Sequence, residues 1–134
     1  MLNRMFRTPP AWALLPLRIG VGVVFLAHGI QKLQWGNAAV TQYFAKVGIP
    51  LAGFWAPVVT WVEILCGAAL VIGLLTRYAA LLLAVEMVVA ILKVHLKAGF
   101  FLPDGYAFAL TLLTATLTLL FAGGGKPSVD QYRE

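Results

Sequence analysis

The sequence predicts an all-α membrane protein, a bundle of four transmembrane helices with a short interfacial helix between the first span and the second. Three observations predict this fold class. Hydrophobic residues make up 61% of the 134 residues and charged residues only 11%, whereas soluble domains carry about 25% charged residues. The mean hydropathy is +0.89, and the apolar residues fall into four blocks. We therefore expect one membrane domain over residues 1–134.

The first span is expected at residues 11–31, after a basic arm that contains Arg4 and Arg7 and ends at Thr8-Pro9-Pro10. This block is longer than the apolar core of a signal peptide, which has about 7–15 residues, and no small-x-small cleavage site follows it. We therefore expect it to be retained as a span.

The connection between the first and second spans is expected to contain a helix over residues 38–47. Asn37 would cap this helix, and Gly48 would end it. Aromatic side chains on the helix and beside it favour a position in the headgroup interface. These aromatic residues are Trp35, Tyr43, Phe44, Phe54 and Trp55.

The remaining spans are expected at residues 54–75, 79–96 and 106–122, with a turn at Thr76-Arg77-Tyr78 between the first two of them. In the last span the threonine hydroxyls can bond back to the preceding turn. Cytoplasmic loops carry an excess of Lys and Arg. Both termini are predicted to be cytoplasmic because their side of the membrane holds more Lys and Arg residues. That side holds Arg4, Arg7, Arg77, Lys126 and Arg133. The opposite side holds Lys32, Lys46 and Lys97, with Lys93 nearby.

The formal charge of +5 does not indicate a nucleic-acid partner, because the basic residues are scattered along the chain. They suit loops that meet anionic lipid headgroups, so the lipid bilayer is the expected partner. Cys66 is the only cysteine, which excludes an internal disulfide and a CxxC redox pair.

Several polar side chains lie inside the expected spans. Charges within a membrane are costly, so they should face the bundle interior and pair. The predicted topology places four of them in the non-cytoplasmic half, where Glu63 could meet Lys93, Lys32 or a histidine from a neighbouring helix. The four are His28, Glu63, Lys93 and His95. Glu86 lies deeper, seven residues before Lys93 on one helix face.

Structural roles compete with functional ones for each of these residues. A buried ion pair at Glu63 can serve packing alone, the histidines can face the interface, and Lys32 and Lys97 can extend to the headgroups. Arg18 can do the same at the cytoplasmic rim, or it can pair with Glu86. Cys66 is interpreted as a small buried hydrophobe rather than a reactive thiol.

As chemistry, a buried acid beside histidines suits the proton-coupled redox reaction of a quinone. A quinone needs hydrogen-bond donors at its carbonyl oxygens and a group that gives or takes protons. No flavin or haem site is indicated, since a dinucleotide fingerprint is absent and two separate histidines are weak support for axial ligation. No metal site is expected either, because His28 and His95 lack a third spaced ligand.

Motifs along nearly the whole chain resemble those of the DoxX family of small membrane proteins. They are Leu17-Arg18-Ile19-Gly20, residues 25–33, Gly48-Ile49-Pro50, Glu63-Ile64-Leu65-Cys66-Gly67, residues 73–80, Met87-Val88-Val89-Ala90, Val94-His95, Gly99-Phe100-Phe101, Gly105-Tyr106, Gly123–Gly125 and Ser128-Val129-Asp130. The resemblance implies a four-helix membrane protein of an oxidoreductase-labelled family. Related DoxD-type proteins form the membrane subunit of a thiosulfate:quinone oxidoreductase.

The sequence departs from the family pattern at one position. An acidic residue often follows Gly-Tyr in the family, and here Ala107 stands there. Two interpretations stay open: Glu86 takes over the role of that acid, or this member lacks the corresponding activity.

Our leading hypothesis from the sequence is an inner-membrane oxidoreductase component that handles a quinone beside a soluble redox partner, with homo-oligomerisation possible. Glu63, His28 and His95 are the candidate catalytic residues, and Arg18, Lys32, Glu86 and Lys93 are the candidate binding residues. A non-catalytic scaffold or assembly factor is the first alternative. A small-solute or proton transporter is the second, although the sequence has no inverted repeat.

Overall fold

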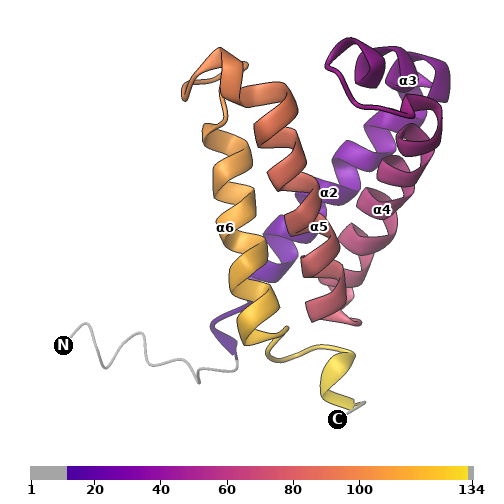
Figure 1. The fold of residues 1–134 in the computed structure, drawn as a ribbon. Coiled ribbons are helices and arrows are strands. Elements are labelled where there is room, and N and C mark those ends of the chain that lie inside the picture. The colour runs from indigo at the N-terminus through magenta and orange to yellow at the C-terminus, as the bar shows by residue number, and fades with distance from the viewer. Residues whose placement is uncertain (1–11, 133–134) are drawn as a thin grey trace.

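The computed structural model describes residues 12–132, and in that range the chain forms five α-helices and no strand (Figure 1). The predicted all-α class is confirmed. The basic arm with Arg4 and Arg7, and also Arg133, lie outside the described residues.

The helices form two antiparallel pairs that lean against each other (Figure 1). In the first pair, α2 (Leu15–Trp35) packs along α4 (Ala52–Ile72), and in the second, α5 (Thr76–Ala90) packs along α6 (Ala107–Ala122). The short helix α3 (Asn37–Lys46) contacts the N-terminal part of α4.

Glycines on α2 let the first pair approach closely. A Cβ atom added at Gly22 would lie 2.8 Å from the carbonyl oxygen of Gly67, and one added at Gly29 would lie 2.6 Å from Cγ1 of Ile64. Small residues allow helix backbones to meet in this way in membrane proteins. The two helices are therefore held in one register over about two turns.

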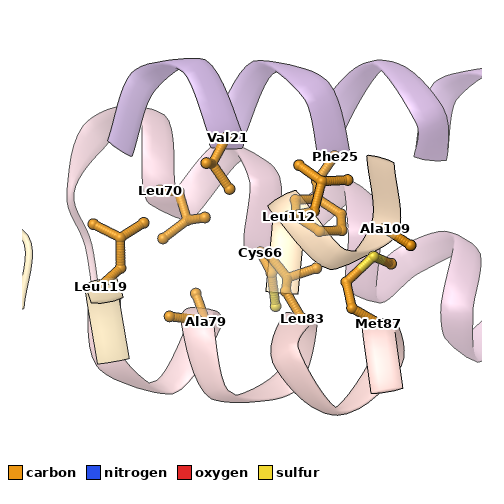
Figure 2. Close-up of a cluster of buried hydrophobic side chains, with 11 residues drawn as sticks. Val21, Phe25, Cys66, Leu70, Ala79, Leu83, Met87, Ala109, Leu112 and Leu119 are labelled. Carbon is orange, nitrogen blue, oxygen red and sulfur yellow. The ribbon is translucent and has the colours of Figure 1, made fainter. Parts of the chain in front are cut away.

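A single apolar core joins the four long helices. Figure 2 shows side chains from all of them meeting there, and Phe25, Leu70, Leu83 and Leu119 are each no more than 2% exposed. Cys66 is one of the core residues, as predicted, since only 8% of it is exposed. A second, small cluster of Val40, Phe44 and Ala56 attaches α3 to α4.

The turn between α4 and α5 lies three residues earlier than predicted. Helix α4 ends at Ile72 rather than Leu75, because Gly73 adopts a left-handed conformation (φ 75°) that ends helices readily. Helix α5 then begins at Thr76, within the predicted turn. The backbone N–H groups of Leu75 and Thr76 both donate to the carboxylate of Asp130, 55 and 54 residues further along the chain.

The first two helices also differ from the prediction in detail. Helix α2 extends to Trp35 rather than Gln31. The predicted cap at Asn37 is wrong: Gly36 occupies the cap position, no side chain caps α3, and Asn37 is its first residue. The predicted stop at Gly48 is confirmed, because the helix ends at Lys46 and Gly48 has a φ of 87°.

Beyond α5 the helix continues as a π-helical turn, η2 (Ile91–His95), and a short 3₁₀ turn, η3 (Leu96–Ala98). Two helices, Ala52–Ile72 and Thr76–Ala98, are long and apolar enough to cross a membrane, and Ala107–Ala122 is a shorter apolar helix. In α6 the predicted back-bonding is confirmed, since all four threonine hydroxyls donate to carbonyl groups three or four residues earlier.

Candidate functional site

An ion pair between α2 and α4 forms the centre of the candidate site. Lys32 donates to both carboxylate oxygens of Glu63, with Nζ at 2.9 Å from Oε1 and 2.8 Å from Oε2. The Glu63 side chain is 6% exposed and that of Lys32 18%. Of the three partners that the sequence left open for Glu63, the structure selects Lys32.

The close approach of α2 and α4 positions this pair. A Cβ atom at Gly29 would lie only 3.1 Å from Cβ of Glu63, so the glycine lets α4 bring its carboxylate against α2. Lys32 lies three residues after Gly29, and residues three apart share a helix face. The ammonium group therefore reaches the carboxylate across the glycine contact.

Helix α5 adds a second carboxyl group to the pair. Both carboxyl oxygens of Glu86 are buried, and within residues 12–132 neither accepts a hydrogen bond from a donor. Glu63 and Lys32 are the charged groups close enough to act on this carboxyl group. Two ionised carboxylates only accept hydrogen bonds, so they cannot bond to each other unless one carries a proton. We call Lys32, Glu63 and Glu86 the acid–lysine cluster.

The two histidines lie outside this cluster. His28 is exposed, one helical turn before Lys32, and its Nδ1 lies 2.7 Å from the carbonyl oxygen of Val24. His95 is half-buried in η2, and its Nδ1 lies 2.9 Å from the carbonyl oxygen of Asp104. A carbonyl only accepts, so we assign the proton to Nδ1 in both rings. The Nε2 atoms then remain for other partners.

An aromatic ring that no sequence motif indicated as part of the site lies beside His28. The ring centroids of His28 and Phe108 are 6.2 Å apart and the planes are tilted by 33°. Phe108 belongs to the first turn of α6, and its side chain is exposed. The only signal in the sequence is an aromatic residue near the predicted start of the last span.

Lys93 and Arg18 do not join the acid–lysine cluster. Lys93 is exposed on η2. Arg18 is 2% exposed near the start of α2, and its guanidinium donates to the carbonyl oxygens of Gly124 (2.8 Å) and Pro127 (2.7 Å). Arg18 therefore holds the segment after α6, and it does not pair with Glu86. An open, mostly apolar hollow lies beside it, lined in part by Val71, Ile72 and Val129.

The part of the chain that the structure describes contains no group of three or more His, Cys, Asp or Glu side chains that could hold a metal ion. What the acid–lysine cluster can do chemically is exchange protons and donate hydrogen bonds. The ammonium group of Lys32 has three N–H donors, and Glu63 occupies two of its bonds.

Comparison with known proteins agrees with the resemblance seen in the motifs. A sequence model of the DoxX family matches residues 13–96. An uncharacterized membrane protein of Mycobacterium tuberculosis is 38% identical over 134 aligned residues, which cover 92% of this chain and 81% of that protein. A Bacillus subtilis protein named "Putative oxidoreductase CatD" is 34% identical over 105 residues, covering 78% of this chain and 76% of that protein. No solved structure matches.

Proposed function

Because the chain belongs to the DoxX family and is an integral membrane protein, we propose that it is the membrane component of a quinone-linked oxidoreductase. In this proposal the chain crosses the bacterial cytoplasmic membrane four times, with both termini in the cytoplasm, and works beside a soluble redox partner. The name of the Bacillus subtilis relative supports the oxidoreductase class.

The length of α2 and its charges support the four-span arrangement. At about 1.5 Å per residue, the 21 residues of α2 extend over roughly 31 Å, which matches the roughly 30 Å hydrocarbon core, whereas the 16 residues of α6 extend over roughly 24 Å and are shorter than that core. Helix α2 has Arg18 near one end and Lys32 near the other, which suits a span whose charged groups lie toward the two membrane surfaces. The acid–lysine cluster then lies in the outer half.

The observation that carries the proposal is the buried ion pair of Lys32 and Glu63. The carbonyl oxygen of a quinone accepts hydrogen bonds, and Lys32 keeps one N–H beyond the two that Glu63 accepts. His28, one turn away, can accept through Nε2 as a neutral ring and donate through it as an imidazolium, and the ring of Phe108 offers an apolar surface for a quinone ring. These residues fit a quinone headgroup.

The reaction converts a quinone to a quinol by adding two electrons and two protons, or runs in reverse. We assign the electrons to the soluble partner and the protons to this chain. Glu63 exchanges the two protons with the substrate in turn, Lys32 neutralises its carboxylate between the transfers, and His28 orients the ring. His95 and Lys93 lie on η2, a π-helical turn of the kind often found at functional sites.

A binding experiment tests the proposal directly. The purified protein in lipid nanodiscs is titrated with short-chain ubiquinone and menaquinone analogues, and binding is followed by quenching of tryptophan fluorescence. Lys32→Met should raise Kd about tenfold or more, because it removes a charged hydrogen bond. Lys97→Met, an equal change at an exposed lysine, should leave Kd unchanged. Absence of binding by the wild type, or equal effects of the two variants, would contradict it.

One observation favours a second candidate, a non-catalytic scaffold. The Lys32–Glu63 pair lies at the glycine contact of α2 and α4, so it could serve only to hold these helices together. A scaffold predicts that Glu63→Gln lowers the unfolding temperature while the Kd for quinone analogues stays at the wild-type value. The oxidoreductase proposal predicts that binding weakens by more than the loss of folded protein explains.

A further inference from the structure

The acid–lysine cluster brings three ionisable side chains from three helices into the protein interior. Lys32 comes from α2, Glu63 from α4 and Glu86 from α5. Cys66 on α4 is another titratable group close to Glu86. The remaining titratable residues of α2, α5 and η2 are Arg18, His28, Arg77, Tyr78, Lys93 and His95. Helix α6, which packs along α5, has no titratable residue. Among residues 12–132, Lys32 is the one lysine or arginine that acts on the two carboxyl groups.

The charges of this cluster do not balance if both acids are ionised. One ammonium group would face two carboxylates, and uncompensated charge in a low-dielectric interior is strongly unfavourable. The hydrogen bonds do not balance either, because Lys32 donates two bonds to Glu63 while both oxygens of Glu86 are buried without a donor. A single proton between the two carboxyl groups corrects the charge and gives one of the two Glu86 oxygens a hydrogen-bond partner.

We infer that Glu63 and Glu86 share one proton, so that the cluster is a buried proton-binding site with Lys32 as its fixed counter-ion. Glu86 is the carboxylic acid, and its O–H donates to the Glu63 carboxylate, which also accepts the two bonds from Lys32. The cluster then carries one positive charge and one negative charge. This site shares Lys32 and Glu63 with the proposed quinone site, but it holds its proton whether or not a quinone binds, so a failure of this inference is distinguishable from a failure of the proposed function.

The requirement that the positive and negative charges of the acid–lysine cluster balance predicts how many protons the cluster holds in each variant. Glu86→Gln removes the acid and leaves none. Glu63→Gln also leaves none, because Glu86 then ionises as the partner of Lys32. Lys32→Met removes the cation, and with no counter-ion both carboxyl groups are protonated.

Infrared spectroscopy counts these protons. The C=O stretch of a carboxylic acid is separate from the bands of carboxylates and shifts in D₂O. The chain has only five Asp and Glu residues, so the band can be assigned. At neutral pH we expect one protonated carboxyl group per chain in the wild type, none in Glu86→Gln and Glu63→Gln, and two in Lys32→Met. Asp104→Asn, an equal change at an exposed acid, should keep the wild-type band.

Several results would overturn the inference. A wild-type spectrum without the band shows that both acids are ionised. In that case, a higher unfolding temperature in the presence of Na⁺ or K⁺ would assign the compensating charge to a bound cation. A band that persists in Glu86→Gln belongs to another carboxyl group. The wild-type spectrum shows whether one carboxyl group is protonated even if a variant fails to fold.

Discussion

The carboxylate of Asp130 caps the helix that begins at Thr76, although the two residues are 54 positions apart. Its Oδ2 accepts the backbone N–H of Thr76 at 2.8 Å, and its Oδ1 accepts that of Leu75. The first N–H groups of a helix have no partner within the helix, and an acid near them also interacts favourably with the helix dipole. The segment after α6 therefore ties the end of the chain to the α4–α5 turn.

We expect Asp130→Ala to destabilise the protein by about 1–2 kcal/mol, the usual effect of losing a helix cap. The free energy of unfolding in a fixed detergent mixture measures this. Lys126→Gln, at an exposed residue of the same segment, is the control and should have little effect. Equal stability of the two variants would contradict a capping role for Asp130.

Arg18 fastens the same segment from α2. Its guanidinium donates to the carbonyl oxygens of Gly124 and Pro127, and hydrogen bonds from charged groups contribute about 1.5–3 kcal/mol. We expect Arg18→Lys to lose one of the two contacts, because an ammonium group lacks the planar fork of arginine. Hydrogen exchange over residues 123–132 should be faster in Arg18→Lys and faster still in Arg18→Ala. Unchanged exchange in both variants would show that the segment is held by other contacts.

The two carboxyl groups of the acid–lysine cluster should not behave additively. In Glu63→Gln, Glu86 can still compensate the charge of Lys32, and in Glu86→Gln the Lys32–Glu63 pair remains. The double variant leaves Lys32 without a counter-ion, and an unpaired buried charge costs about 3–5 kcal/mol. We therefore expect the double variant to lose more stability than the sum of the single variants, as measured by unfolding in one detergent mixture.

The control for this double-mutant cycle combines Glu86→Gln with Asp104→Asn. Asp104 is exposed on the loop before α6, outside the cluster, so these two changes should add within about 0.5 kcal/mol. Additive behaviour of the Glu63 and Glu86 changes as well would show that the two carboxyl groups do not share one counter-ion.

The helices could be predicted from the sequence because long apolar blocks separated by Gly and Pro are a local signal. The depth of Glu63 in its block likewise predicted a polar partner. The choice of Lys32 over Lys93 could not be made, since it depends on the packing of α2 against α4 and on the π-helical turn that carries Lys93. The role of Arg18 could not be predicted from the sequence either, because its carbonyl partners lie 106 and 109 residues further along the chain.

Gly29 lies at the contact between α2 and α4, beside the Lys32–Glu63 ion pair, and we expect it to set the spacing of these helices. A Cβ atom at Gly29 would lie 2.6 Å from Cγ1 and 2.9 Å from the backbone nitrogen of Ile64. Because a backbone atom cannot move aside alone, Gly29→Ala should separate α2 from α4 and destabilise the protein by about 1–3 kcal/mol. Gly20 on the same helix has no atom within 4 Å of an added Cβ, so Gly20→Ala should be neutral or stabilise by up to about 1 kcal/mol. Unfolding of both variants in one detergent mixture checks this, and a Gly29→Ala protein as stable as Gly20→Ala would show that the contact does not set the helix spacing.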